Sequence, residues 1–202
     1  MSNNSIGLDY SSTHFYVDSN GERCDMPHFY QMQEERINKL KNVLKKCQRG
    51  SNNYYKIKDK IGKIYLKTKN QRNDYLHKLS TKIANQYDIV SIEDINMIEM
   101  AQTLKLAKNT YDNAYGKFAD LLKYKLENQG KVLIKIDRYY PSSKKCHICG
   151  FINTNLQIDN RKWICPQCGS VLDRDVNAAI NIKERGIEEY RSLGYRDIKP
   201  IR

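Results

Sequence analysis

Long apolar runs are missing from this 202-residue sequence, and none approaches the roughly 18 residues that a membrane-spanning helix requires. The first residues, MSNNSIGLDY, also lack the basic and then apolar layout of a secretory signal. There is no internal repeat and no low-complexity tract. With 40% hydrophobic and 29% charged residues, the chain is too apolar for a disordered basic tail and too charged for a membrane-embedded protein. We therefore expect a folded protein of the cytoplasm with no membrane partner.

Acidic residues are also scarce, since 23 Asp and Glu stand against 35 Lys and Arg, for a formal net charge of +12. The excess is concentrated in residues 34–82, which hold fifteen Lys and Arg against four Asp and Glu. This segment carries +11 and the rest of the chain only +1. One basic segment of this kind predicts a contact surface for a polyanion such as nucleic acid. The solvated face of long helices would give the same count, so both interpretations stay open.

The first half of the chain predicts a strand pair followed by long helices. Residues 5–10 and 13–17 are rich in strand formers, and the turn signal DSNGER at 18–23 predicts an opening hairpin. Apolar residues then recur at three- and four-residue steps over about 30–87, with a break near QRGSNN at 48–53. This pattern predicts two long antiparallel helices.

The second half predicts two strands that flank a helix. Short strand patterns lie at 88–93 (DIVSIE) and 131–137 (KVLIKID). Between them an apolar stripe from Tyr111 to Leu126 predicts a helix that stops at Gly130. A last helix is expected over 175–185, ended by Gly186. Strands and helices in this order predict a mixed α/β core.

Four of the six cysteines form two CxxC pairs: Cys146, Cys149, Cys165 and Cys168. Each pair presents two thiolates on one tight turn, and a glycine follows directly where such a turn needs a positive φ. Four thiolates make a closed tetrahedral site, so the spacing predicts one structural Zn²⁺ rather than a redox pair. His147 lies between the first two cysteines and is not needed as a ligand.

Three acids lie between apolar neighbours: Asp9, Glu93 and Asp175. Carrying a carboxylate toward a core is costly unless something compensates it, and carboxylates gathered on a sheet are a way to hold Mg²⁺ for phosphoryl transfer. The residues alone leave other roles open, because a strand-end acid can be solvated and Asp173 or Asp175 can cap the last helix. Asp94 and Asp173 are the nearest alternative ligands.

The order of these features resembles a known family. The matching stretches are IGLDYS, NQRNDYLHKLSTKIANQYDIVSIEDIN, YYPSSKKCHICG and WICPQCGSVLDRDVNAAINI, which together extend over residues 5 to about 186. They resemble the C-terminal nuclease half of the TnpB/OrfB proteins of bacterial insertion sequences, relatives of the type V CRISPR effectors. The resemblance implies a RuvC-like, RNase H-type mixed sheet in residues 1–140, with a basic helical insertion at about 30–87. It implies an inserted zinc ribbon at 141–172 and a last RuvC-like segment with a tail at 173–202.

The resemblance also implies a chemistry. Asp9, Glu93 and Asp175 would be the catalytic acids of a DNA endonuclease and would hold two Mg²⁺, with Mn²⁺ as an alternative; Asp175 is chosen because the family's third acid directly precedes the xNAA run. The partners implied are DNA and, in full-length members, a guide RNA in a bacterial cytoplasm. The helical insertion would lie beside the guide–target duplex, with phosphate contacts from Lys56, Lys58, Lys60, Lys63, Lys67, Lys69 and Arg72.

One departure from the family bears on this expectation. Full-length members carry a substantial N-terminal half, which reads the target motif and grips much of the guide RNA, whereas the first acid here is residue 9. We expect a truncated product or transposon remnant, with a short protein beside a full-length homologue and a free-standing minimal nuclease as alternatives. The competing function is a non-catalytic, zinc-containing nucleic-acid-binding protein.

Overall fold

The computed structural model describes residues 4–11, 13–96, 114–157 and 159–194. The stripe residue Tyr111 lies outside these ranges. The elements in chain order are β1 Ser5–Tyr10, β2 Tyr16–Asp18, β3 Arg23–Cys24, α1 Gln31–Lys46, α2 Asn52–Gln86, β4 Ile89–Glu93, α5 Tyr115–Glu127, β5 Val132–Ile136, β6 Lys162–Ile164, β7 Val171–Asp173 and α6 Arg174–Ser192. No helix in the described part of the chain has both the length and the apolar character needed to cross a membrane.

The core is a five-stranded mixed sheet in the order β3-β2-β1-β4-β5. The pairs β1–β4 and β4–β5 are parallel, and β1–β2 and β2–β3 are antiparallel. Leu8 pairs with Ile92, so the next residues of these strands, Asp9 and Glu93, lie side by side at the carboxyl ends of β1 and β4. The predicted mixed α/β core is confirmed.

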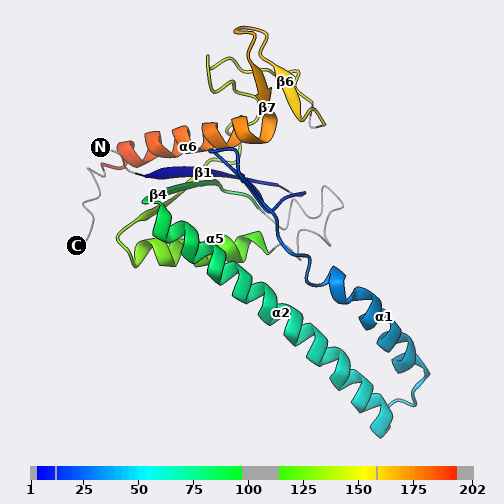
Figure 1. Cartoon of the computed structure of the whole chain (residues 1–202). Coiled ribbons are helices and arrows are strands. Elements are labelled where there is room, and N and C mark those ends of the chain that lie inside the picture. The colour runs from blue at the N-terminus through cyan, green and yellow to red at the C-terminus, as the bar shows by residue number, and fades with distance from the viewer. Residues whose placement is uncertain (1–3, 12, 97–113, 158, 195–202) are drawn as a thin grey trace.

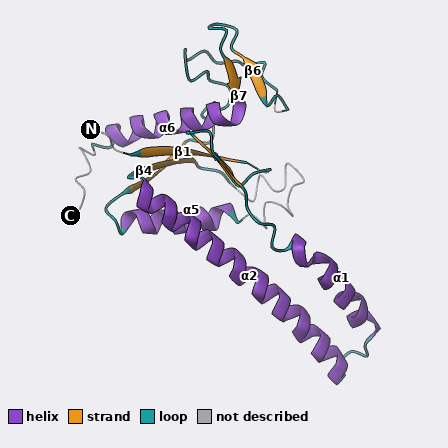
Figure 2. Cartoon of the chain, viewed as in Figure 1, coloured by secondary structure: helices purple, strands orange, loops and turns teal. Residues whose placement is uncertain are grey.

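Helices cover both faces of the sheet, as Figures 1 and 2 show. Ile6 and Leu8 are buried in a core cluster with residues of α2 and α5, such as Leu76 and Phe118. Because successive side chains of a strand alternate between faces, Gly7 and Asp9 face the opposite side, where α6 lies. The acids of β1 and β4 therefore share the α6 face.

The last helix does not stop at Gly186 as the sequence predicts. α6 continues to Ser192, and the backbone of Gly186 lies against the side chain of Ser91 on β4. A Cβ at this position would overlap the Ser91 side chain. The glycine therefore permits a close approach between helix and sheet rather than ending the helix.

The opening hairpin is confirmed in outline but shifted. The antiparallel pair across the DSNGER turn is β2 with β3, and the Asp18 carboxylate accepts the backbone N–H groups of Asn20 and Glu22 at 2.9 and 3.0 Å. β2 begins at Tyr16 rather than Thr13. The residues before it turn instead, where the Ser11 hydroxyl accepts the His14 N–H.

The two long helices form a projecting arm. α1 and α2 meet at a turn where Gly50 has φ +86° and the Ser51 hydroxyl caps α2 by accepting the Tyr54 N–H. We call residues 31–72 the helical arm; it extends beyond the sheet in Figure 1. From Leu76 onward one face of the same helix packs into the core. The predicted break near residues 48–53 is confirmed.

Candidate active site and metal centre

The three predicted acids lie in one region: Asp9 and Glu93 are at the carboxyl ends of β1 and β4, and Asp175 is in the first turn of α6. Desolvation raises the pKa of Asp9 well above its ordinary value, and the charges of Glu93 and Asp175 raise it further. The carboxylate of Asp9 accepts no hydrogen bond from the described residues. Burial also raises the pKa of Glu93. The arrangement therefore concentrates negative charge around Asp9, which the nearby guanidinium groups of Arg174 and Arg161 offset only in part.

Asp175 is the acid with direct cationic partners. Its side chain is buried, and Arg161 Nη1 donates to Oδ2 at 2.7 Å. Arg174 donates to Oδ1 through Nη2 at 2.9 Å and Nε at 3.1 Å. Both carboxylate oxygens are thus engaged by guanidinium groups.

The two alternative acids are occupied elsewhere. Asp173 caps α6, since its Oδ1 accepts the backbone N–H groups of Asp175 and Val176, and its Oδ2 pairs with Arg23 at 2.8 Å. Asp94 is exposed and pairs with Lys135 at 3.3 Å. Of the two acids that could cap the last helix, Asp173 is the cap, and the charge of Asp175 acts on Asp9.

Two further residues belong to the site although the sequence analysis did not single them out. The buried Ser142 donates its hydroxyl to Glu93 Oε1. Tyr115, the first residue of α5, has a buried hydroxyl without a hydrogen-bond partner among the described residues, and burial, followed by the charges of Asp9 and Glu93, raises its pKa. The sequence signal that could have found Ser142 is its place in the matching stretch YYPSSKKCHICG.

The four cysteines come together as their spacing predicts, in an arrangement that could hold a metal ion. Their Sγ atoms all lie within 4.8 Å of one another, with Cys146–Cys168 at 3.8 Å and Cys149–Cys165 at 3.6 Å. Tetrahedral zinc with Zn–S bonds of about 2.3 Å needs sulfur atoms about 3.8 Å apart. Gly150 and Gly169 have φ +78° and +72°. The donor set therefore fits a metal such as zinc; in the described residues, the acids form no cluster this compact.

We call residues 141–172 the cysteine ribbon, which is held to α6 by two buried asparagines. Asn177 Nδ2 donates to the Lys145 carbonyl at 2.8 Å, and its Oδ1 accepts the His147 N–H at 3.0 Å. Asn181 Nδ2 donates to the carbonyls of Ser142 and Lys145 at 2.8 and 2.6 Å. His147, unnecessary as a zinc ligand, thus belongs to the attachment between ribbon and helix.

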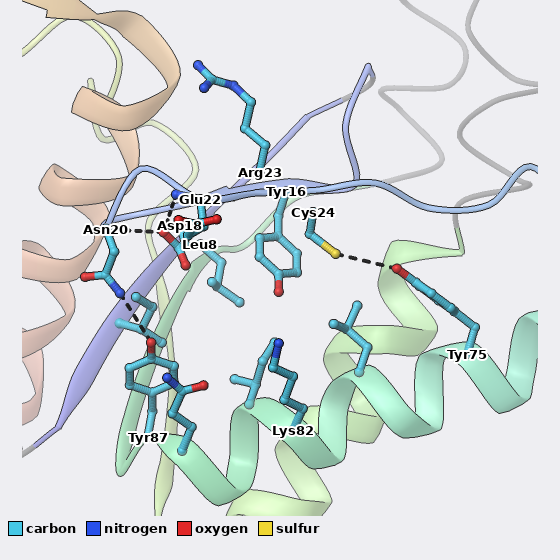
Figure 3. A pocket seen from close by; sticks show the side chains of 14 residues that line it. Leu8, Tyr16, Asp18, Asn20, Glu22, Arg23, Cys24, Tyr75, Lys82 and Tyr87 are labelled. Carbon is cyan, nitrogen blue, oxygen red and sulfur yellow. Dashed lines mark hydrogen bonds between the residues drawn. The ribbon is translucent and has the colours of Figure 1, made fainter.

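A separate cavity of about 470 Å³ lies on the other face of the sheet, between β1–β3 and α2. Figure 3 shows Tyr16 and Lys82 pointing into it, and the Cys24 thiol 3.7 Å from the Tyr75 hydroxyl. Ile6 and Leu8 form part of its wall. None of the three predicted acids lines it, so the cavity is not part of the acid site.

The predicted phosphate contacts lie on the helical arm but do not share one surface. The six lysines are exposed and Arg72 is half-buried. At 3.6 residues per turn, Lys56, Lys60, Lys63 and Lys67 fall within about 60° of arc on one flank of α2. Lys58 and Lys69 fall on the other flank. Lys63 is paired with Asp59 at 2.8 Å.

Comparison with known proteins assigns the chain to a family. Residues 1–104 match the sequence profile of the OrfB_IS605 family, described as a probable transposase. Residues 115–182 match the profile of the Cas12f1-like TNB domain. The chain belongs to the TnpB/OrfB family. The cysteine ribbon and the first turns of α6 lie within the residues that match the TNB profile, and β1 and β4 lie within those that match the OrfB_IS605 profile.

Several TnpB-family relatives are named as RNA-guided DNA endonucleases. The one from Streptomyces pristinaespiralis is 35% identical over 182 residues, which cover 90% of this chain and 45% of the relative. InsQ of Escherichia coli K12 is 25% identical over 196 residues, 90% of this chain and 48% of InsQ. The chain thus spans less than half the length of these relatives.

The fold is similar to that of solved Cas12f proteins. A Cas12f1 structure with sgRNA and target DNA matches with a TM-score of 0.60 and 17% identity, covering 88% of this chain and 49% of the solved chain. A Cas12f ternary complex matches with a TM-score of 0.62 and 16% identity, covering 97% and 39%. At 17% and 16% identity, the similarity to these structures shows only that this TnpB-family chain shares their fold.

Proposed function

We propose that the chain is a metal-dependent DNA endonuclease domain of the RuvC-like, RNase H type, with Asp9, Glu93 and Asp175 as its catalytic acids. The observation that carries this proposal is geometric: Asp9 and Glu93 lie at the carboxyl ends of two adjacent parallel strands, and the charges of Glu93 and Asp175 both act on Asp9. The names of the relatives support an endonuclease. The proposed division is a nuclease core in 1–140, a zinc ribbon in 141–172 and a last nuclease segment in 173–202.

The residues at the acid site fit divalent cations. The donors are carboxylate oxygens from three elements, which Mg²⁺ and Mn²⁺ prefer. Asp9 accepts no hydrogen bond from the described residues, and the Tyr115 hydroxyl beside the acids has no partner among them, so the site holds uncompensated polar groups. A pair of Mg²⁺ held there would supply an activated water and neutralise the leaving 3′ oxygen.

The protein's own residues would hold the site in place. Asp9 and Glu93 stand on adjacent parallel strands, so the sheet fixes their separation. Ser142 holds one oxygen of Glu93. Arg161 and Arg174 neutralise Asp175: two hydrogen bonds from Arg174 engage Oδ1, and one from Arg161 engages Oδ2, which keeps acceptor capacity for a cation.

The proposed partners are DNA and a guide RNA, with contacts from the helical arm. A solved relative is a complex of Cas12f1 with sgRNA and target DNA. The exposed lysines of α2 offer charge for a nucleic-acid backbone without base-specific geometry. Binding through such contacts would weaken steeply with salt.

Cleavage of labelled single-stranded DNA in Mg²⁺ tests the proposal. Glu93→Gln should lower the rate by on the order of a hundredfold or more, because a lost metal ligand removes transition-state charge stabilisation. The matched control is Asp94→Asn, which changes the adjacent, exposed acid and should leave the rate unchanged. Equal rates in wild type and Glu93→Gln would show that the acid site is not the source of cleavage.

The second candidate function is nucleic-acid binding without catalysis. It is favoured by the two arginines that engage both oxygens of Asp175. On this alternative, binding of DNA or RNA falls with salt, depends on the arm lysines and is indifferent to Glu93→Gln. Absence of cleavage together with such binding would select it.

A further inference from the structure

A continuous series of hydrogen bonds joins the first CxxC turn to the second acid. His147, inside that turn, bonds to Asn177 of α6 through its N–H at 3.0 Å and its Nδ1 at 2.9 Å. Asn177 and Asn181 donate to the carbonyl of Ser142 at 3.4 and 2.8 Å. The Ser142 hydroxyl then donates to Glu93.

These bonds leave Ser142 little freedom. Its side chain is buried, its own N–H donates to the Tyr140 carbonyl at 2.7 Å, and its carbonyl accepts from both asparagines. A serine hydroxyl has one proton to donate, and here it is given to Oε1 of Glu93. Oε2 keeps its acceptor capacity toward the acid site. Outer partners of this kind orient a ligand carboxylate.

We propose that Ser142 is a positioning residue for Glu93, through which the attachment of the cysteine ribbon to α6 sets the orientation of the second metal-binding acid. This inference rests on the proposed function, because only the proposed function assigns a metal ion to Glu93. It assigns the ribbon a role in the acid site besides its own metal. The neighbouring Ser143 provides the comparison, because only its carbonyl takes part, accepting from Asn177 at 3.4 Å.

The test measures Mn²⁺ binding directly, by the loss of the free-Mn²⁺ paramagnetic resonance signal in the zinc-loaded full chain. Ser142→Ala should weaken Mn²⁺ binding about tenfold, the lower end of the range for lost outer partners of metal ligands. Ser142→Thr, which keeps the hydroxyl, should restore affinity to near the wild-type value. Ser143→Ala should bind Mn²⁺ as wild type does.

Two controls separate positioning from general damage. Trp163 is the only tryptophan of the chain and is buried in the ribbon, so its emission reports whether the ribbon stays folded. Ser142→Ala should leave this emission and the zinc content unchanged. If Ser142→Ala changes the Trp163 emission, the Mn²⁺ affinity of Ser142→Thr is compared with that of wild type instead. A tenfold loss of Mn²⁺ affinity in Ser142→Thr would overturn the proposal.

The outcomes also distinguish this inference from the proposed function. Mn²⁺ binding that is lost in Glu93→Gln but is within twofold of wild type in Ser142→Ala would overturn the positioning role alone. Wild-type protein without any Glu93-dependent Mn²⁺ binding would overturn the metal site itself, and the positioning role with it. A selective loss in Ser142→Ala supports both.

Discussion

At the scale of single residues, Asp9 is the most unfavourably placed charge of the acid site. The folded protein raises the pKa of Asp9, so the folded state binds this proton more tightly than the unfolded chain. The stability that the folded state gains from this tighter proton binding is fully present below the ordinary pKa of a carboxyl group. It is lost as the pH rises through the raised pKa of Asp9. The free energy of unfolding of the metal-free protein should therefore fall across that window.

Asp9→Asn tests this expectation, because it removes the charge and keeps the shape. In thermal unfolding without divalent metal at neutral pH, the variant should melt higher than wild type by about 2–4 °C, the equivalent of 1 kcal/mol in a chain of this size. Its melting temperature should also vary less with pH. Asp94→Asn, at an exposed acid, serves as control, and an Asp9→Asn curve as pH-dependent as that of wild type would contradict the explanation.

The residues that sequence reasoning found and missed differ in a physical way. The cysteines are recognisable from their type and spacing, whereas the three acids are selected through the family resemblance. Ser142 and Asn177 lie within the matching stretches, but their contacts, like that of Arg161, arise only when the cysteine ribbon folds back onto α6 and β4. Such contacts depend on tertiary structure, and no local pattern encodes them.

At the scale of elements, the contact between α6 and the sheet makes a clear prediction. Gly186→Ala should lower the free energy of unfolding by about 1–3 kcal/mol, because its Cβ would overlap Ser91 and force a shift in a packed region. Gly62→Ala is the matched control, since Gly62 lies inside α2 with open space around it. That variant should gain about 0.5–1 kcal/mol from helix propensity.

Urea unfolding of the two glycine variants provides the measurement. Opposite signs are expected, and a stabilised Gly186→Ala would show that the helix can move away from β4 at little cost. The same position explains why the end of α6 is predicted wrongly. A glycine that ends a helix and a glycine that lets a helix touch a sheet look identical in sequence, and only the partner strand separates them.

The two flanks of α2 predict different effects on nucleic-acid binding. Lys56 and Lys67 belong to the flank with four lysines, whereas Lys58 and Lys69 lie on the other flank. Both pairs are exposed and eleven residues apart, so the double Glu variants are matched in charge and spacing. For an RNA–DNA duplex, Lys56→Glu/Lys67→Glu should weaken binding at least tenfold and reduce the salt dependence by about two phosphate contacts.

Lys58→Glu/Lys69→Glu should have the smaller effect in the same titration. Equal losses in the two variants would mean that the arm acts through its total charge rather than through one flank.

At the scale of the whole molecule, the sequence predicts the order of the strands and helices along the chain better than it predicts how they pack against one another. The alternation of Ile6, Gly7, Leu8 and Asp9 shows two different faces, and the helical break near Gly50 is visible in composition. The sheet order and the meeting of β1, β4 and α6 depend on chain-wide packing. The acids were therefore predictable as a set through the family resemblance, but the contacts around them were not.

The cysteine ribbon and the rest of the chain should respond differently to zinc removal. The ribbon has a small core, formed by Leu156, Trp163 and Leu172 with its cysteines, so its folding should depend on the metal. A strong chelator should shift Trp163 emission to longer wavelength while most helical circular dichroism remains, because α1, α2 and α5 lie outside the ribbon.

Cys165→Ser should reproduce the chelated state and lose bound zinc. Cys24→Ser/Cys47→Ser, which alters the two cysteines outside the cluster, should retain about one zinc per chain by metal analysis. Retained zinc in Cys165→Ser would contradict the assignment of the metal centre.

The length of α2 has a consequence for how this protein can change in evolution. One unbroken helix of 35 residues, about 52 Å long, carries the lysines at one end and enters the core at Leu76. A single residue inserted between Arg72 and Leu76 would turn the arm lysines of α2, Lys56 to Lys69, by about 100° around the helix axis relative to the core, whereas seven inserted residues would return them to within about 20°. Because the proposed contacts need the lysines to keep their direction, we expect insertions tolerated in the arm to come in steps close to whole turns.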